Sequence, residues 1–188
     1  MRPLVFVDVE TGGLDAKNDA LLEVAAVCVF GDTPASVIHR YVLPVGNITP
    51  RAREVNGYDE DVWRERGAVP LKNAVRDLAA FFKECGEKAF FCGHNPRFDY
   101  DFLKRAFARV RRPFPATDYH LLDTASLAVP LLLAGDVESL SLKSLCEFMG
   151  TIPQPDHSAI NDVRATLSLF HGLIGLYVYK AGEDGNVQ

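Results

Sequence analysis

Short continuous runs of apolar residues occupy the first quarter of the chain, a pattern that is typical of buried β-strands. Residues 21–30 and 37–43 form two such runs, and only residues 31–34 connect them. So short a connection predicts that these two strands pair in antiparallel fashion. The strands predicted along the whole chain are residues 4–9, 21–30, 37–43, 89–92 and 118–123.

Helical signals dominate from the middle of the chain onward. Apolar residues recur at helical spacing over Leu71–Cys85, and Thr49-Pro50 and Asn95-Pro96 are each typical of an N-cap followed by proline at the first helical position. Asn56-Gly57 is a helix-stop signal. The predicted helices are residues 50–56, 71–85, 96–107, 124–133, 141–149 and 158–177. The last helix is expected to bury Ile160, Val163, Leu167, Phe170 and Ile174.

Three strands followed by alternating helices and strands predict a three-layer α/β domain with a mixed central sheet flanked by helices. The chain has 188 residues, which suits one domain with a substantial core. We expect residues 1–180 to form this domain and residues 181–188 to be a short polar tail.

Composition limits the class of protein. Apolar residues make up 48% of the chain and charged residues 24%, which is ordinary for a globular protein in water. Neither a bilayer-spanning run nor a signal peptide is present, so a cytoplasmic location is expected, with no membrane partner. The four cysteines form no C-x-x-C pair and are predicted to be reduced and buried, which argues against zinc and against a disulfide framework.

Candidate chemistry begins at the end of the first strand, where Asp8 and Glu10 interrupt an apolar run. Residues at i and i+2 of a strand point to the same side, roughly 6.5 Å apart. Two bare carboxylates there are costly unless a cation neutralises them, and Mg²⁺ or Mn²⁺ would be suitable. The alternative is a pair of acids at a strand end that faces solvent.

Three further residues stand at element ends that could converge on this pair. Asp99 falls in the first turn of a predicted helix, where the helix dipole favours a carboxylate. Asp162 lies in the first turns of the last helix, and His157 precedes it by five positions. Two metal ions need three or four carboxylates, and a nearby imidazole could take a proton from attacking water. Taken singly, each has a plainer interpretation as a surface acid or a loop histidine.

As a set, these residues resemble the DEDD superfamily of 3′→5′ exonucleases in its histidine-containing branch. The matching motifs, over roughly residues 4–177, are Asp8-Val9-Glu10-Thr11, His94-Asn95-Pro96-Arg97-Phe98-Asp99 and His157-x₄-Asp162. Ser158 stands where the tyrosine branch would carry tyrosine. Within the histidine branch the pattern is most similar to ribonuclease T-like proteins, for example in residues 16–23, 56–57, 66–69 and 123–125.

The resemblance implies a ribonuclease H-like fold and a catalytic arrangement with two Mg²⁺ or Mn²⁺ ions. Asp8, Glu10 and Asp162 would hold one ion, Asp8 would bridge to the second, and Asp99 would act on that ion through water. His157 would be the general base. The expected reaction is hydrolysis of the terminal phosphodiester of a single strand or of a duplex 3′ overhang, which releases 5′-mononucleotides.

The resemblance also implies a substrate surface and a homodimer. Thr11 and Gly12 would touch the last nucleotide, next to Asn56, while Phe98 and Tyr119 fall at base-stacking positions and Leu14 and Val55 replace aromatic residues at two others. Lys104 and four arginines form a basic cluster, which is either a solvated helix face or a track for phosphates. The arginines are Arg105, Arg109, Arg111 and Arg112.

Two rival functions are considered. One is a catalytically idle module that binds nucleic acid and keeps the exonuclease fold; no acid of the set is missing, which disfavours it. The other is a ribonuclease H-like endonuclease, which the spacing of His157 and Asp162 and the Thr11–Leu14 turn disfavour. A formal net charge of −5 argues at first against a nucleic-acid partner, but acids that ligate metal ions reverse the local field. Whether the substrate is DNA or RNA stays open at this point.

Overall fold

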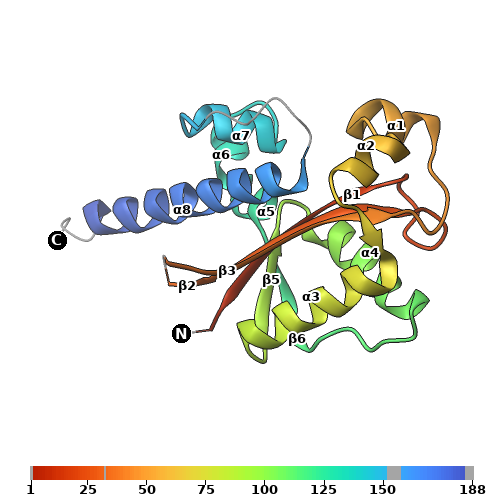
Figure 1. The fold of residues 1–188 in the computed structure, drawn as a ribbon. Helices are drawn as coiled ribbons and strands as arrows, with labels where there is room; N and C mark the ends of the chain where they lie inside the picture. Colours follow the sequence, from red (N-terminus) through yellow and green to blue (C-terminus); the bar gives the residue numbers. More distant parts are fainter. Residues whose placement is uncertain (1, 32, 152–157, 185–188) are drawn as a thin grey trace.

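The computed structural model describes residues 2–31, 33–151 and 158–184, with the side chains placed as far as residue 178. Within these ranges six strands form one mixed sheet in the order β4-β3-β2-β1-β5-β6 (Figure 1). Antiparallel pairing joins β1 to β2 and β2 to β3, whereas β5 and β6 run parallel to β1. The strands are β1 (Leu4–Thr11), β2 (Leu21–Phe30), β3 (Thr33–Leu43), β4 (Val69–Pro70), β5 (Ala89–Gly93) and β6 (Thr117–Asp123).

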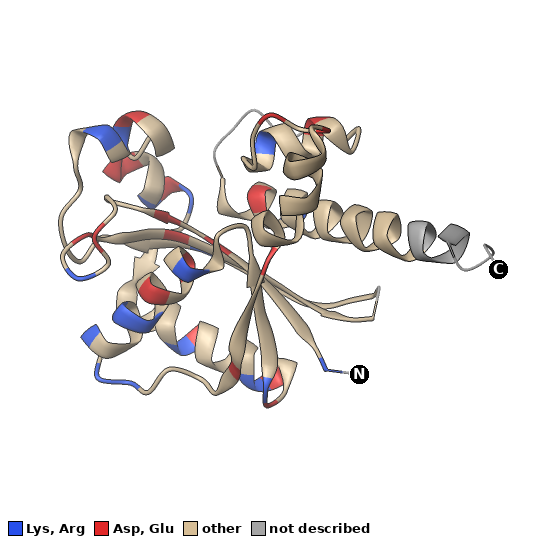
Figure 2. Cartoon of the chain, turned by 180° about the vertical axis from the view of Figure 1, so that it is seen from behind, with Lys and Arg blue, Asp and Glu red and all other residues tan. Residues whose placement is uncertain are grey.

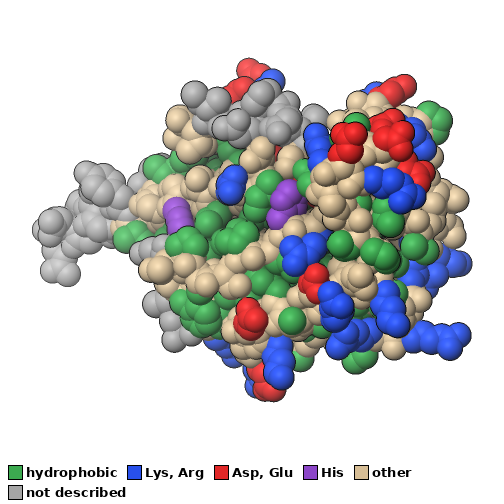
Figure 3. Space-filling model, in the orientation of Figure 1, with side chains coloured by type: hydrophobic (Ala, Val, Ile, Leu, Met, Phe, Trp, Pro, Cys, Tyr) green, Lys and Arg blue, Asp and Glu red, His purple; other side chains and the backbone are tan. Residues whose placement is uncertain are grey.

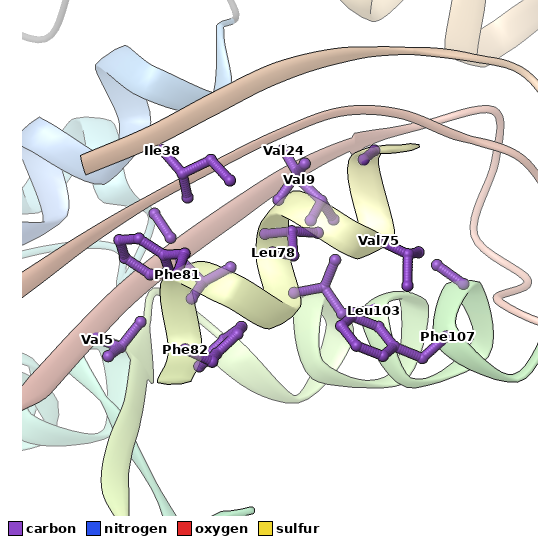
Figure 4. Close-up of a cluster of buried hydrophobic side chains, with 14 of the residues drawn as sticks. Val5, Val9, Val24, Ile38, Val75, Leu78, Phe81, Phe82, Leu103 and Phe107 are labelled. Atoms are coloured by element: carbon purple, nitrogen blue, oxygen red, sulfur yellow. The ribbon is translucent and has the colours of Figure 1, made fainter. Parts of the chain in front are cut away.

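Helices cover both faces of the sheet, which confirms the predicted three-layer α/β architecture. On one face α3 (Leu71–Cys85) and α4 (Pro96–Arg109) enclose the largest apolar cluster, which includes Val5, Leu78 and Phe107 (Figure 4). On the other face α8 (Ala159–Asp184) packs on Phe6, whose ring lies 5.3 Å from that of Phe170. The sheet is therefore buried from both sides along its central strands.

The central strand β1 extends beyond its parallel neighbour, and this offset creates room for a site. Pairing of β1 with β5 covers only Leu4 to Phe6, because β5 ends at Gly93. Pairing with β2 continues on the other side as far as Thr11. The last residues of β1 therefore lie at an open end of the sheet, next to the starts of α4 and α8.

Local signals placed most helix ends correctly. The side chain of Thr49 accepts a hydrogen bond from the Ala52 N–H at 3.1 Å, and Gly57 ends α1 (Pro50–Asn56) in the left-handed region at φ 65°. α4 begins at Pro96 as predicted, but Asn95 does not cap it through its side chain. Instead Asn95 adopts a left-handed conformation, and its N–H donates to Asp123.

Two short elements were not predicted. α2 (Glu60–Glu65) buries only Trp63, and β4 has two residues, so neither displays a period that a pattern search could detect. Trp63 fixes α2 on the sheet, because its indole N–H donates to the Leu22 carbonyl oxygen at 2.8 Å.

The C-terminal half differs in detail from the prediction. One helix was expected over residues 124–133, but α5 (Thr124–Leu127) and α6 (Val129–Ala134) are separate because Pro130 has no N–H to continue the hydrogen bonding. α7 (Leu142–Phe148) follows as expected. α8 continues to Asp184, past the predicted start of the tail at residue 181. Ile174 is 39% exposed, contrary to prediction, because the helix turns Leu169 and Leu173 towards α5–α7.

Two sequence predictions about environment can be compared with the structure. The four cysteines are free and buried, as expected. Among the described residues, no helix is both long enough and apolar enough to cross a membrane.

Candidate active site

Three carboxylates meet at the open end of the sheet. Asp8 and Glu10 lie two residues apart on β1, and Asp162 lies in the first turn of α8. One ligand oxygen from each lies within 4.8 Å of the others, the only such group of candidate metal ligands among the described residues. All three side chains are partly buried, and Figure 2 shows acidic residues in the central strands of the sheet. The structure therefore brings together Asp8 and Glu10, which the strand periodicity placed on one side, and Asp162 of the last motif.

The start of α8 places Asp162. Ser158 precedes the helix, and its carbonyl oxygen accepts from the N–H groups of Asn161 at 2.9 Å and Asp162 at 3.0 Å. Ala159 and Val163 pack without exposure into the cluster beneath β1 and β2. The positive end of the helix dipole thus lies beside the three carboxylates and favours their negative charge.

Asp99 lies beside this group and has a second role. Its carboxylate is 4% exposed and accepts a hydrogen bond from the Val9 N–H at 3.0 Å. Because β5 ends at Gly93, that stretch of β1 is bonded by a side chain from α4 rather than by a neighbouring strand. Asp99 is therefore tied to the backbone between Asp8 and Glu10, and it is not one of the three clustered ligands.

The electrostatics of the site are unfavourable for negative charge. Burial, and then the charges of Asp99 and Asp162, raise the pKa of Asp8 well above its usual value. Burial and the charge of Glu23 raise the pKa of Glu10 to about 8, and burial raises that of Asp99 to about 7 against the hydrogen bonds it accepts. An all-oxygen set of acids that repel one another fits a hard divalent cation, which would remove the repulsion.

These pKa shifts predict that the metal-free protein loses stability between pH 5 and pH 8. The folded pKa values of about 8 for Glu10 and about 7 for Asp99 exceed the ordinary values of 4.5 and 3.8, so the folded state binds more protons than the unfolded state in this range. The protonated side chains of Glu10 and Asp99 stabilise the folded state fully at low pH, and this stabilisation is lost as the pH rises through their folded pKa values. One pKa unit is about 1.4 kcal/mol, and 1 kcal/mol shifts the Tm of such a domain by roughly 2–4 °C. We expect a fall of roughly 5 °C or more in EDTA.

Thermal unfolding at the two pH values, with EDTA and with Mn²⁺, measures this effect. Added Mn²⁺ should restore the Tm at pH 8, and Glu10→Gln should flatten the pH dependence in EDTA. A Tm in EDTA that rises from pH 5 to pH 8 would contradict the electrostatic account.

The turn after β1 is rigid and closely packed. The Gly12 N–H donates to the Ala20 oxygen at 2.8 Å, and the Gly12 carbonyl oxygen accepts from the Thr49 N–H at 2.7 Å. The Asn56 side chain donates to the Thr11 oxygen at 2.9 Å. A Cβ on Gly12 would lie 2.2 Å from the Asn47 oxygen, so only glycine fits. The Thr11 hydroxyl donates to the Gly13 oxygen at 2.6 Å. The Thr11 hydroxyl and the Gly12 N–H, which were expected to contact a nucleotide, thus donate within the protein.

The predicted base-contacting residues differ in exposure. Leu14 is 88% exposed at the tip of the turn, and Val55 is 44% exposed on α1. Tyr119 is 86% exposed on the edge strand β6. Phe98 is partly buried, with its ring 4.8 Å from that of Phe102, and it also lines an open cavity of about 430 Å³ at the start of α4.

The four arginines of the basic cluster divide into two groups. Arg105, Arg111 and Arg112 are exposed along α4 and the loop after it, where Figure 2 shows basic residues, and Figure 3 shows Lys and Arg side chains gathered on this side of the molecule. Arg109 differs from them, because its guanidinium donates to the carbonyl oxygens of Lys17, at 2.9 Å, and Val45. Arg109 therefore ties together two loops behind the turn, and its predicted place in a phosphate track does not agree with these contacts.

Glu23 and His39 also lie in the region of the three carboxylates. His157, the predicted general base, lies outside the described residues. Glu23 on β2 was not predicted, although it is 1% exposed and lies directly across the β1–β2 pairing from Glu10. His39 on β3 contacts it, with Nε2 2.7 Å from Oε1. A lone acid inside the apolar run of residues 21–30 was the signal that could have identified Glu23.

Comparison with known proteins identifies the family. A family model described as "Exonuclease" (RNase_T) matches residues 5–170. Ribonuclease T of Vibrio vulnificus is 32% identical over 97% of this chain and 90% of its own length. Ribonuclease T of Citrobacter koseri is 34% identical over 95% of this chain and 87% of its own.

Solved structures agree in fold. Escherichia coli exonuclease I, solved in complex with a dT13 oligonucleotide, has a TM-score of 0.78 at 19% identity, over 95% of this chain and 43% of its own. This chain therefore spans less than half the length of that enzyme, and the likeness concerns the ribonuclease H-like fold. The extent and identity of the matches with the family model and with ribonuclease T establish that the chain belongs to the RNase T family of exonucleases, which hydrolyse phosphodiester bonds.

Proposed function

We propose that this protein is a metal-dependent 3′→5′ exonuclease that removes 5′-mononucleotides from single-stranded nucleic acid or from 3′ overhangs of duplexes. The observation that carries the proposal is the convergence of Asp8, Glu10 and Asp162 beside a rigid turn at the end of β1. Support for single strands comes from exonuclease I, which was solved with a dT13 oligonucleotide. The names of the ribonuclease T relatives agree with RNA as a further substrate.

The proposed roles follow from the donor set. Asp8, Glu10 and Asp162 would hold the divalent metal, Mg²⁺ or Mn²⁺. Asp99 keeps the β1 backbone in place through the Val9 N–H and adds negative charge beside Asp8. Bound divalent ions supply Lewis acidity at the phosphate and lower the pKa of water. His157 is proposed as the base that takes the proton from the attacking water.

The turn explains why the enzyme would act on a chain end. Its backbone groups are hydrogen-bonded to Ala20, Thr49 and Asn56, so the turn is held in a fixed position next to the carboxylates. We propose that the fixed turn prevents a strand from continuing past the carboxylates, and that Leu14, which is 88% exposed, contacts the last bases. We therefore propose that Thr11 and Gly12 act by shape rather than by donating hydrogen bonds.

Degradation of labelled single strands tests this proposal. A 3′-labelled strand should release labelled mononucleotide at once, whereas a 5′-labelled strand should shorten in single-nucleotide steps. A 3′-phosphate should inhibit, because it occupies the position of the terminal hydroxyl beside the turn. Rapid cutting of circular single strands would contradict the proposal in favour of an endonuclease, and binding without any degradation would favour an idle module. Parallel DNA and RNA substrates, with and without duplex, identify the substrate class.

The exposed arginines give a second test. Replacing Arg105, Arg111 and Arg112 with Gln should weaken binding of all single strands and reduce the slope of log K against log salt by about 2, since each phosphate contact contributes about 0.7. Turnover at saturating substrate should change little. Arg64→Gln on α2 is the control, because this arginine is paired with Glu60. An unchanged salt slope would identify the three arginines as an ordinary solvated surface.

Location and assembly are part of the proposal. The four free, buried cysteines agree with a reducing cytoplasm. The homodimer stays a prediction from the resemblance, and light scattering of the purified protein tests it.

A further inference from the structure

Glu23 is the most deeply buried acid of the described site region, and the proposed chemistry does not use it. It is 1% exposed on β2. After burial, the negative charge of Glu23 raises the pKa of Glu10 more than any other charge does. A buried carboxylate next to other carboxylates is costly unless donors satisfy it. The structure supplies two donors, both to Oε1, and they connect Glu23 to two different elements.

The first donor connects Glu23 to α8. The Ser158 hydroxyl lies 3.2 Å from Oε1 of Glu23, and Ser158 itself is 9% exposed. The carbonyl oxygen of the same serine accepts the N–H of Asp162. Ser158 thus bonds to Glu23 with its side chain and to the backbone of Asp162 with its carbonyl oxygen. Ser158 therefore links Glu23 on β2 to the first turn of α8.

The second donor connects Glu23 to β3. His39 and Glu23 lie on the same side of the sheet, since Tyr41, two residues after His39, is the register partner of Glu23. The His39 ring lies 4.9 Å from that of Tyr41, which in turn lies 5.3 Å from that of Trp63. This row of rings is fixed to the sheet by the bond from Trp63 to the Leu22 oxygen. His39 thus holds the Glu23 carboxylate in one orientation.

We propose that Glu23 is a positioning residue that sets the distance between Asp162 on α8 and the Asp8–Glu10 pair on β1. The inference rests on the proposed function, because it assumes that these three carboxylates bind the metal. Glu23 itself stands outside the three clustered ligands. Its effect is transmitted through Ser158 and requires an acceptor oxygen rather than a negative charge.

This distinction defines the variants. Glu23→Ala removes the acceptor, Ser158→Ala removes the donor, and Glu23→Gln keeps an oxygen at Oε1 while it removes the charge. Asp77→Asn is the matched control. Asp77 also accepts a hydrogen bond from a β3 residue, Arg40 at 3.0 Å, but Asp77 itself lies on α3, which covers the other face of the sheet.

Calorimetric titration of the metal-free variants with Mn²⁺ is the measurement, with Mn²⁺-dependent turnover recorded beside it. Loss of a group that orients a metal ligand costs about 10–100-fold in metal affinity. We expect a loss of this size in Glu23→Ala and Ser158→Ala, near wild-type affinity in Glu23→Gln, and no change in Asp77→Asn. Turnover of the two affected variants should recover largely at high Mn²⁺, because the ligands themselves remain.

Several results would overturn the inference. Wild-type affinity in Glu23→Ala or in Ser158→Ala would mean that α8 is placed without this contact. Equal losses in Glu23→Ala and Glu23→Gln would mean that charge, not position, matters. If Glu23→Ala does not fold, Ser158→Ala and Glu23→Gln decide the question. Failure of the proposed function is distinguishable, because wild type would then bind no Mn²⁺, or Asp8→Asn would bind it as tightly as wild type.

Discussion

Asp8→Asn is expected to reduce turnover by roughly 10³–10⁵-fold and, in the same protein, to raise the Tm of the metal-free state. The loss follows from the proposed role of Asp8 in holding the metal, which would supply several kcal/mol of charge stabilisation in such a site; each 1.36 kcal/mol is a factor of ten in rate. The gain follows from burial and from the charges of Asp99 and Asp162, which together raise the pKa of Asp8. A neutral amide removes that repulsion.

Asp77→Asn is the matched control, and we expect it to change the Tm in the opposite direction. Burial opposes the shift, but hydrogen bonds from Arg76 and Arg40 lower the pKa of Asp77, so its charge stabilises the folded state. The same substitution there should lower the Tm and leave turnover nearly unchanged. Turnover at saturating Mn²⁺ and thermal unfolding in EDTA at pH 8 measure both effects. If Asp8→Asn keeps a tenth of wild-type turnover, Asp8 does not hold the metal.

Most of the fold was predictable because its elements carry local signals. The apolar runs of β1 and β2, the periodicity of α3 and the caps at Thr49 and Gly57 depend on neighbours in sequence. One failure was local, because Pro130 separates α5 from α6. The others arose where distant contacts decide. α2 exists because Trp63 docks on Leu22, and α8 exposes Ile174 because α5–α7 cover a different side of the helix.

The site divides in the same way. The strand spacing of Asp8 and Glu10 is a local property, so their common direction could be predicted, and the motif spacing located Asp162. Three features needed the tertiary structure. They are the bond from Val9 to Asp99 past the end of β5, the attachment of Arg109 to two loops, and the burial of Glu23 between His39 and Ser158.

His157→Ala carries the second largest expected effect, a loss of about 10²–10⁴-fold in turnover, which is typical when a general base is removed. His157 lies outside the described residues, so its role is proposed from the motif His157-x₄-Asp162 alone. The base must be neutral to accept a proton, and an imidazole has an ordinary pKa near 6.5. Wild-type turnover should therefore decline as the pH falls and the base becomes protonated, and the variant should lose this limb of its pH profile.

Metal binding separates this role from that of the carboxylates. His157→Ala should bind Mn²⁺ with nearly wild-type affinity in calorimetry, because Asp8, Glu10 and Asp162 remain, whereas Asp8→Asn should not. His171→Ala is the control for loss of an imidazole, because His171 lies on the same helix as Asp162 but nine residues further along it, roughly 13 Å at 1.5 Å per residue. Turnover of His157→Ala within a few-fold of wild type would contradict the proposed role. The proton of the attacking water would then have to pass to another acceptor, and the pH profile of the variant would locate its pKa.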